Sequence, residues 1–230
     1  MGIRRGPNIV QSGLVLSLDA GNVRSYPGSG TNWKDVSGRN STGTLTNGTG
    51  YSTANRGTLV FDGSNDYVNL GTSAVFNQFA GDFTISAWAN RSNSGPSFGN
   101  IIGDYYTNGV ATTGEWQIMM TNGGAFNLYK VGPGYLINTT ANFGGNTWHN
   151  VVVTRTGSGI TMYVNSTSVA TATDSNTFGT ATGNVNIGVD GDNSSEPFGG
   201  SIAIVQIYNR GLTASEILQN YNMTKSRFGK

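Results

Sequence analysis

The sequence predicts an all-β protein, a sandwich or barrel of short antiparallel strands, on grounds of composition and hydrophobic pattern. Gly, Asn, Thr and Ser make up close to half of the 230 residues, and only 11% of the residues are charged. These small polar residues are poor helix formers and good turn formers. Segments with alternating apolar residues recur about every ten residues with turn residues between them, which is the pattern of stacked sheets.

The predicted strands have apolar side chains at every second position. In chain order they cover residues 14–19, 58–61, 67–70, 83–90, 116–120, 126–128, 148–155, 160–164, 185–189 and 202–208. Two pairs are predicted to be hairpins, because Asn122-Gly123-Gly124 separates one pair and the sequence TGSG separates the other. The last strand has apolar residues at successive positions, which predicts burial on both faces.

One short helix is predicted near the C-terminus. Thr213 and Glu216 have the spacing of a capping box, in which the Thr hydroxyl caps the third amide and the Glu side chain reaches back. Ile217, Leu218 and Tyr221 then supply an apolar stripe that continues to about Met223.

The strands recur without a change in composition, which predicts one domain over residues 13–225. Residues 1–12 carry Arg4 and Arg5 without a hydrophobic period, and we interpret them as an N-terminal arm. This arm is either a frayed end or a segment that docks on a partner, with Ile9 and Val10 entering a groove of that partner. Residues 226–230 are predicted to be a loose basic tail.

The composition excludes several kinds of function. A net charge of +1 gives no strong field that would attract nucleic acid. The absence of Cys excludes disulfides, thiolate zinc sites and Cys nucleophiles, and the single histidine, His149, excludes multi-His metal sites. No segment approaches the roughly 18 apolar residues of a membrane-spanning helix, and the first residues lack the apolar stretch of a secretory signal. We therefore expect a soluble protein that is not exported by the usual signal and does not insert into a membrane.

Several segments resemble one known family. They are GLVLSLDAGN (13–22), GTLVFDGSNDYVNLG (57–71), DFTISAWANR (82–91), TWHNVVVTR (147–155), ITMYVNSTSVAT (160–171) and GGSIAIVQIYNRGLTASEILQNY (199–221). Together they are similar to the concanavalin A-like lectin/glucanase superfamily, in its laminin G-like branch. The resemblance implies a jelly-roll sandwich of two curved antiparallel sheets, with a concave face that often binds sugars. The ending LQNYNMTKSRFGK is also similar to laminin G-like proteins of tailed bacteriophages.

The resemblance to glucanases does not extend to their catalytic residues. Glucanases of this superfamily use a Glu-x-Asp-x-x-Glu pattern, which places carboxylates on one face of a strand. Glu115, Glu196 and Glu216 are the three Glu residues here, and none has a carboxylate at that spacing. His149 occupies the position where the family has a His after Trp, and we expect it to be a structural residue bonded to a neighbouring loop. We therefore predict that the protein is not an enzyme.

Two clusters of oxygen ligands are candidate calcium sites, since hard cations prefer such ligands. One contains Asp62, Asn65 and Asp66, and the other contains Asp190, Asp192 and Glu196. The alternative for the first cluster is turn formation through side chain-to-backbone hydrogen bonds, and for the second a solvated loop. The family's last strand usually reads Gly-x-Ile-Asp-Glu-Val, and Ala203 in place of the Asp weakens the case for calcium. No other cofactor is indicated.

Four aromatic residues are candidates for stacking on a sugar ring, because the ring face of a sugar is apolar and its rim carries hydroxyls. They are Trp33, Tyr105, Tyr106 and Tyr135, which lie in segments without alternation. The alternative for each is packing within a loop.

The favoured hypothesis is a non-enzymatic protein of the phage virion surface, a capsid decoration or appendage component that displays a lectin-like jelly roll. It would be assembled in the host cytoplasm, docked on other virion proteins through the arm with Arg4 and Arg5 or through the basic tail, and turned outward toward cell-surface or environmental glycans. A homo-oligomer is compatible with the sequence. The first alternative is a stand-alone carbohydrate-binding module or adhesin without a virion role, and the second is a glycoside-active enzyme.

Overall fold

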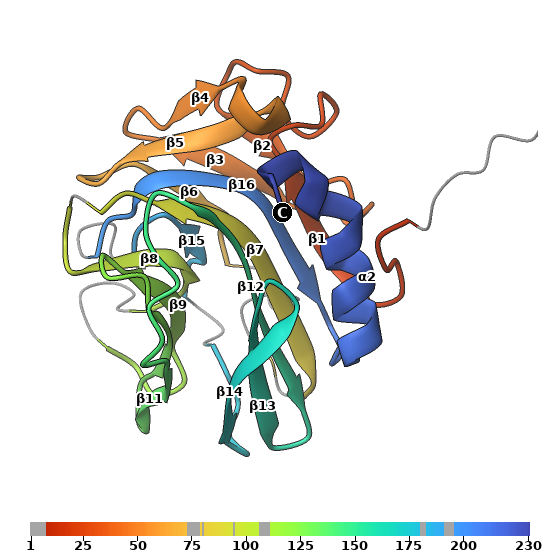
Figure 1. The fold of residues 1–230 in the computed structure, drawn as a ribbon, viewed down its shortest axis with the longest axis vertical. Helices are drawn as coiled ribbons and strands as arrows, with labels where there is room; N and C mark the ends of the chain where they lie inside the picture. Colours follow the sequence, from red (N-terminus) through yellow and green to blue (C-terminus); the bar gives the residue numbers. More distant parts are fainter. Residues whose placement is uncertain are drawn as a thin grey trace, which may run out of the picture.

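Two antiparallel eight-stranded sheets stack face to face in the computed structural model (Figure 1). The structure describes residues 8–72, 79, 81–93, 95–105, 111–179, 183–190 and 196–230. We call the two layers the back sheet and the front sheet. The strand order of the back sheet is β14 (Thr167–Thr173), β13 (Gly159–Val164), β12 (Trp148–Thr156), β7 (Phe83–Arg91), β16 (Gly199–Tyr208), β5 (Thr58–Asp62) and β4 (Gly50–Ser52), with β1 (Leu14–Asp19) also paired to β16. The order of the front sheet is β11 (Gly134–Asn138), β10 (Phe126–Lys130), β9 (Trp116–Thr121), β8 (Phe98–Gly103), β15 (Asn186–Ile187), β6 (Tyr67–Asn69), β3 (Thr42–Thr46) and β2 (Asn32–Lys34). This is the all-β jelly-roll sandwich that the sequence predicts.

The main core fills the space between the sheets and follows the alternation seen in the sequence. Trp116, Ile118 and Met120 of β9 point into it together with Phe126 and Leu128 of β10. The two strands form the predicted hairpin, in which Met120 lies opposite Phe126. The predicted strand 202–208 forms most of the central strand β16. Residues 202–208 are all buried, as their successive apolar positions indicate.

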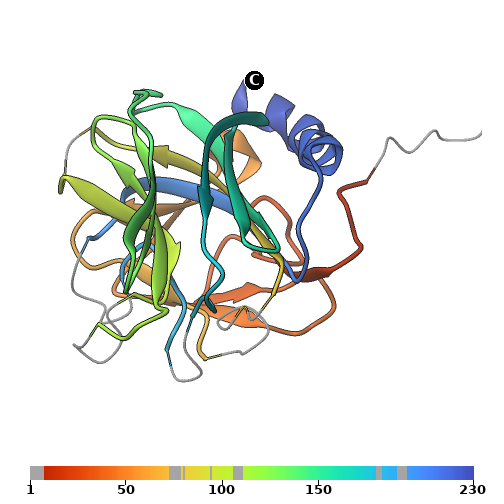
Figure 2. The same cartoon turned by 90° about the horizontal axis from the view of Figure 1, so that it is seen from below.

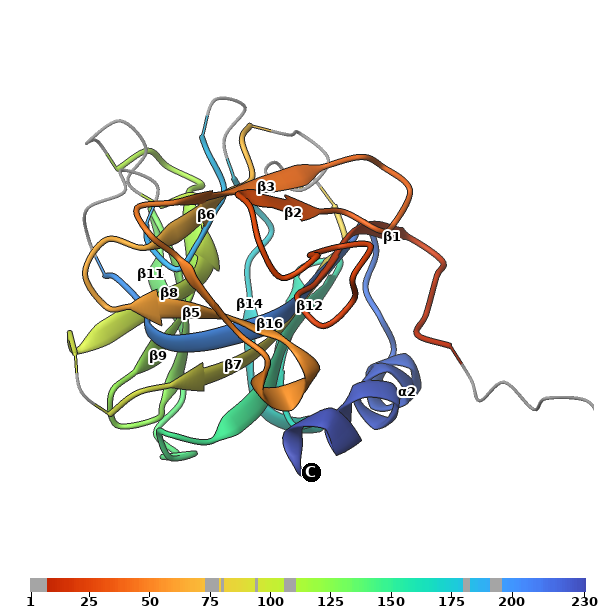
Figure 3. The same cartoon turned by 90° about the horizontal axis from the view of Figure 1, so that it is seen from above.

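A second apolar layer covers the outer face of the back sheet. It is formed by α2 (Ala214–Thr224) and the short 3-10 helix η3 (Lys225–Phe228). Both lie against β7, β12 and β16, on the side away from the front sheet (Figure 1, Figure 2 and Figure 3). The ring of Phe228 stacks on Trp88 with centroids 4.1 Å apart and lies 4.7 Å from Trp148. The prediction of a loose tail over 226–230 is therefore wrong, since Phe228 is needed to cover two tryptophans. Trp148 is buried beneath this tail and not between the sheets.

The predicted capping box is present at the start of α2. The Thr213 hydroxyl accepts a hydrogen bond from the Glu216 backbone N–H, and a Glu216 carboxylate oxygen accepts from the Thr213 N–H at 2.9 Å. Ile217 is buried beneath the helix, whereas Leu218 is exposed. Within the described residues, no helix has the length and apolar character needed to cross a bilayer.

The described part of the N-terminal arm packs on the protein itself. Val10 is buried in a cluster with Leu14, Tyr208 and Ile217, and Ile9 packs against the same cluster. The Val10 N–H donates to the Asn220 side chain at 2.8 Å, and the Val10 carbonyl accepts from the Tyr208 hydroxyl at 3.1 Å. The expectation that Ile9 and Val10 dock in a partner's groove is therefore wrong, because α2 and β16 already supply one. Arg4 and Arg5 lie outside the described residues.

Candidate functional site

The outer face of the front sheet carries polar and aromatic side chains instead of a covering helix. Because side chains alternate along a strand, Gln117 and Tyr129 point away from the core that holds Trp116 and Leu128. The pairing places Gly103 of β8, Gln117 of β9, Tyr129 of β10 and Tyr135 of β11 in one row across four strands. A side chain at Gly103 would collide with the Gln117 Cα, so the close approach of β8 and β9 at this row requires glycine.

Four aromatic rings meet above this row, and we call them the aromatic strip. Tyr129 lies at its centre, with its centroid 5.1 Å from that of Tyr105 and 5.2 Å from that of Tyr135, both in edge-on geometry. Phe98 of β8 stacks loosely on Tyr135 of β11, with centroids 6.5 Å apart. Tyr135 is the most accessible ring, with 48% of its surface exposed. The strip therefore offers one open ring that the others hold in place.

Glu196 joins the aromatic strip from a distant part of the sequence. Its backbone carbonyl accepts from the Asn100 N–H at 2.8 Å, which holds this segment beside β8. Burial raises the pKa of the Glu196 carboxyl, and a hydrogen bond from the Gln117 side chain partly offsets this effect. Burial and the charge of Glu196 raise the pKa of Tyr135, and burial together with Tyr129 and Glu196 raises the pKa of Tyr105 to about 12. Both tyrosines therefore lie within the electrostatic reach of this carboxylate.

Buried amides form the floor beneath the strip. Asn100, Gln117 and Asn127 are each no more than 1% exposed. The Asn100 amide nitrogen donates to the Val189 carbonyl, and the Gln117 amide donates to Glu196. Within the described residues the side-chain oxygens of all three amides, and Oε2 of Glu196, have no hydrogen-bond partner. Such orphaned acceptors are costly in a folded protein unless a ligand or water satisfies them.

The site therefore unites two groups of residues that the sequence suggested for different purposes. Tyr105 and Tyr135 were candidates for sugar stacking, and Glu196 was a candidate calcium ligand. Gln117, Tyr129, Asn100, Asn127 and Phe98 were missed. Gln117 and Tyr129 could have been found, because the alternation that assigns Trp116 and Leu128 to the core leaves these two on the opposite face.

The other stacking candidates have different outcomes. The prediction that Trp33 stacks on a sugar is wrong. Trp33 belongs to β2, and its side chain is fully buried in the main core, so no ring face is open to a sugar. Tyr106 lies outside the described residues.

The first predicted cation cluster makes the hydrogen bonds of a turn. The Asp62 carboxylate accepts from the Ser64 N–H at 2.8 Å, and the Asp66 carboxylate accepts from the Asp62 N–H at 3.0 Å. The backbone carbonyl of Asn65 accepts from the Asn47 side chain at 3.0 Å. These contacts agree with the turn interpretation.

In the second cluster Asp190 is fully buried, Glu196 joins the aromatic strip, and Asp192 lies outside the described residues. Across the described ranges, no three His, Cys, Asp or Glu side chains converge in a way that could hold a metal ion. Calcium binding at either cluster stays a prediction, which thermal melting with and without chelator would test.

His149 is bonded to a neighbouring loop, as the sequence predicts. Its Nε2 lies 3.0 Å from the Gly144 carbonyl oxygen, and its ring contacts Phe126 and Phe143 edge-on. Burial lowers the pKa of the imidazole. The residue joins the loop before β12 to the core.

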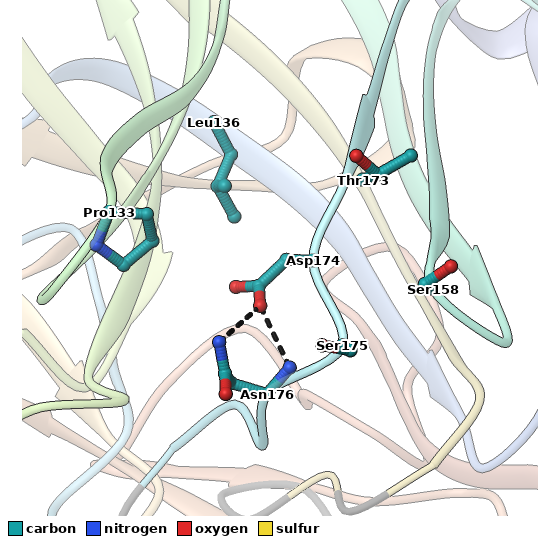
Figure 4. A pocket seen from close by; sticks show the side chains of 7 residues that line it. All are labelled: Pro133, Leu136, Ser158, Thr173, Asp174, Ser175 and Asn176. Carbon is teal, nitrogen blue, oxygen red and sulfur yellow. Dashed lines mark hydrogen bonds between the residues drawn. The ribbon is translucent and has the colours of Figure 1, made fainter.

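An open pocket of about 460 Å³ lies at the edge of the sandwich, between β11 and the segment after β14 (Figure 4). It is lined by Pro133, Leu136, Ser158, Thr173, Asp174, Ser175 and Asn176. The Asp174 carboxylate accepts from the Asn176 backbone and side chain at 2.8 and 2.9 Å, and from Lys130 Nζ at 2.6 Å. Since this charge is already compensated by Lys130, the pocket is a weaker candidate than the aromatic strip.

Comparison with known families gives a match over residues 62–218 to a model described as the concanavalin A-like lectin/glucanases superfamily. No curated protein sequence matches the chain. The matched segment contains the whole aromatic strip and most of the front sheet.

Solved structures with the same fold come from binding domains and from enzymes. Domain 4 of AbnA, a GH43 extracellular arabinanase from Geobacillus stearothermophilus in complex with arabinotriose, has a TM-score of 0.69 at 15% identity, over 90% of this chain and 98% of that one. The binding domain of Paraclostridial Mosquitocidal Protein 1 has a TM-score of 0.68 at 17% identity, over 93% of this chain and 52% of that one. Trypanosoma rangeli sialidase in complex with the inhibitor DANA has a TM-score of 0.68 at 17% identity, over 94% of this chain. This chain spans about half of the mosquitocidal binding domain and 34% of the sialidase, and at these identities the likeness concerns the fold.

Proposed function

Because the chain belongs to the concanavalin A-like lectin/glucanases superfamily, we propose that it is a non-enzymatic binding protein that recognises glycans with its aromatic strip. The observation that carries this proposal is the juxtaposition of the exposed Tyr135 ring with Glu196 and buried amides. A sugar presents an apolar ring face and a rim of hydroxyl donors, and this site presents a ring and a set of acceptors. The arabinotriose in the complex of the arabinanase domain supports the same kind of ligand for this fold.

The test is binding of the purified chain to a panel of immobilised oligosaccharides, followed by titration calorimetry with the best ligand. Tyr135→Ala should abolish binding, whereas Tyr135→Phe should keep most of it, because the ring provides the contact. Leu218→Ala is the matched control, since Leu218 is 47% exposed but lies on α2. Binding by the wild-type protein that Tyr135→Ala leaves unchanged would place the sugar site elsewhere, and no binding to any glycan would contradict the proposal.

The absence of catalysis is part of the proposal. Its support is the missing Glu-x-Asp-x-x-Glu pattern, together with the engagement of Glu216 in the cap of α2. A retaining hydrolase needs two carboxyl groups about 5–5.5 Å apart. Incubation of the protein with its best-binding oligosaccharide should release no new reducing ends. Hydrolysis that Glu196→Gln removes would overturn this part of the proposal.

We further propose that this binding domain is displayed on the surface of a phage virion, docked through the N-terminal residues and assembled in the host cytoplasm. The resemblance of the C-terminal segment to phage proteins supports this role. So does the arrangement of the ends: the described N-terminal residues and α2 lie together, away from β8, β9 and β11 (Figure 1). A domain docked by this end would turn its front sheet outward. A stand-alone adhesin or carbohydrate-binding module is the alternative.

Proteomics of purified particles separates these two roles. The virion role predicts stoichiometric occupancy of the wild-type protein on particles and its loss when residues 1–7 are deleted. Absence of the protein from particles would favour the stand-alone module. Normal occupancy of the truncated protein would move the docking surface to α2 or to the loops of the sandwich.

A further inference from the structure

In the part of the chain that the structure describes, the buried side-chain atoms of the candidate site that lack a hydrogen-bond partner are all acceptors. Within the described residues, the unpartnered buried atoms on the outer face of the front sheet are oxygens of Asn100, Gln117, Asn127 and Glu196. The unpartnered buried donors of the described residues are different groups. The indole nitrogens of Trp33 and Trp116 are in the core, and Nε and Nη1 belong to Arg91, whose guanidinium packs against Gly99. The site is therefore built to receive donors.

The segments that build the aromatic strip carry little positive charge, and Lys34 of β2 lies at the opposite edge of the front sheet. Between residues 92 and 154 the sequence has one Lys or Arg, Lys130, and between 156 and 209 it has none. Lys130 points to the opposite side of its strand, where it pairs with Asp174 and lies over the Phe178 ring. An anionic sugar, such as a uronic or sialic acid, would therefore meet Glu196 without any compensating cation.

Resting on the proposed function, we infer that the site selects glycans that carry a free, protonated amine, with the ammonium group placed between the Glu196 carboxylate and the tyrosine rings. A half-buried carboxylate with an unpartnered oxygen gains more from a cationic donor than from a neutral hydroxyl. The faces of aromatic rings attract ammonium groups for the same electrostatic reason. The ligand class is thus an oligosaccharide of hexosamines without acetyl groups.

Two further features of Glu196 agree with this ligand. Burial raises the pKa of its carboxyl, because burial disfavours the charged form, and a cation bound beside it would offset this effect. Its backbone has a φ of +53°, a conformation that a residue other than glycine adopts at a cost. The burial of the carboxyl and the left-handed backbone are both unfavourable, and both accompany the position of this side chain beside Gln117.

Matched ligands provide the test. The affinity of the wild-type protein is measured for glucosamine oligomers, for N-acetylglucosamine oligomers of equal length and for uronic acid oligomers, at a pH where the amine is protonated and Glu196 is ionised. We expect at least about tenfold tighter binding of the free amine than of its acetylated counterpart, equivalent to about 1.4 kcal/mol. The uronic acid oligomers should bind least.

Two variants assign the preference to its source. Glu196→Gln keeps the shape of the side chain and should reduce the preference for the amine to near unity, while Tyr135→Ala should abolish binding of both neutral and amino sugars. Thermal melting of each variant shows whether it is folded.

Equal affinity for the free and acetylated oligomers, or tighter binding of uronic acids, would overturn the inference and leave glycan binding intact. Loss of amine binding on addition of chelator would also overturn it, in favour of a metal-bridged contact. Binding to none of these oligomers would overturn this inference, and the proposed function would fall with it only if the wider glycan panel also failed to bind.

Discussion

Trp148 is held from two sides at the end of the back sheet. Its indole N–H donates to the Asn55 side chain at 3.1 Å, and its ring lies 4.7 Å from that of Phe228. Phe228 also stacks on Trp88, so one residue of the C-terminal segment covers both indoles. A cavity at any of these three positions would leave large apolar surfaces without a neighbour.

Trp148→Ala should lower the free energy of unfolding by about 3–5 kcal/mol, because it removes a buried aromatic side chain. Phe228→Ala should also destabilise the protein, and the double variant should lose less than the sum of the two, since the rings contact each other. Denaturant melts followed by tryptophan fluorescence measure all three. A loss below about 1 kcal/mol for Trp148→Ala would contradict the burial of this ring.

Lys130 and Asp174 form an ion pair that is almost fully buried at the edge of the sandwich. Their Nζ and carboxylate oxygen are 2.6 Å apart, and the two side chains are 1% and 4% exposed. Burial acts to raise the pKa of Asp174, but hydrogen bonds from Lys130 and Asn176 outweigh it and leave the pKa lowered. The contribution of this pair to stability is therefore present at neutral pH and is lost as the pH falls through the lowered value.

Asp174→Asn should destabilise the protein by about 3–5 kcal/mol, because the buried Lys130 charge then loses its counter-ion and keeps only neutral contacts, with the Asn176 carbonyl and the Phe178 ring. The double variant Lys130→Met with Asp174→Asn should recover part of this loss, since no charge then remains. Urea melts at neutral pH give the three values. A double variant less stable than Asp174→Asn would show that the contacts of the ammonium group with the Asn176 carbonyl and the Phe178 ring suffice to hold the charge.

At the scale of elements, the N-terminal cap of α2 includes the charged side chain of Glu216, which also pairs with Arg210. Arg210 donates to both carboxylate oxygens of Glu216 at 2.6 and 2.9 Å, and the same carboxylate accepts from the Thr213 N–H. These bonds lower the pKa of Glu216 to about 2, and the bond from Arg210 has the largest effect. Since the folded pKa lies below the unfolded one, this stabilisation is complete above the unfolded value and disappears as the pH falls toward 2.

Thr213→Ala should cost about 1 kcal/mol of stability, because the N–H of Glu216 then lacks its acceptor. Thr213→Ser retains the hydroxyl and serves as the control, with little change expected. Both are compared with the wild type in thermal melts at neutral pH. An equal loss for Ala and Ser would assign the effect to the Thr methyl group instead of the cap.

The elements that the sequence predicts are those with a clear apolar period. The hairpin of β9 and β10 is visible because its core residues alternate on either side of Asn122-Gly123-Gly124. β8 is not visible, because a bulge between Asn100 and Ile102 breaks the alternation of FGNIIG. β14 reads TSVATAT, with small side chains whose half-exposed pattern resembles that of a loop.

At the scale of the whole molecule, the site depends on contacts between distant segments that no local pattern reveals. Tyr135 and Tyr105 were recognisable as aromatic residues outside the alternating runs. Their meeting at Tyr129 follows from the pairing of β8 with β9, of β9 with β10 and of β10 with β11. Glu196 reaches the same place only because its carbonyl pairs with the N–H of Asn100 in β8. Register between strands of different hairpins is a tertiary property, and for this reason the sequence suggested separate sites.

Two N-terminal truncations should behave differently. Deletion of residues 1–7 retains the buried Val10, whereas deletion of residues 1–12 removes it together with its bonds to Asn220 and Tyr208. Full burial of a Val contributes about 1.5–3 kcal/mol, so the longer truncation should be measurably less stable. Equal stability of both truncated proteins in denaturant melts would contradict the packing of Val10.

The pairing of the N-terminal segment with α2 also decides how the molecule would bear tension. A pull applied at residue 8 first loads the bonds from Gln219 to the Asn8 carbonyl and from Val10 to Asn220, and then β1. β1 is paired to β16, a central strand that is itself bonded to β5 and β7. The load therefore passes from β1, which pairs with β16 alone, into the middle of the back sheet, where it is shared among several strands. A domain that binds a surface with its front sheet while held by this end would carry the tension through its back sheet.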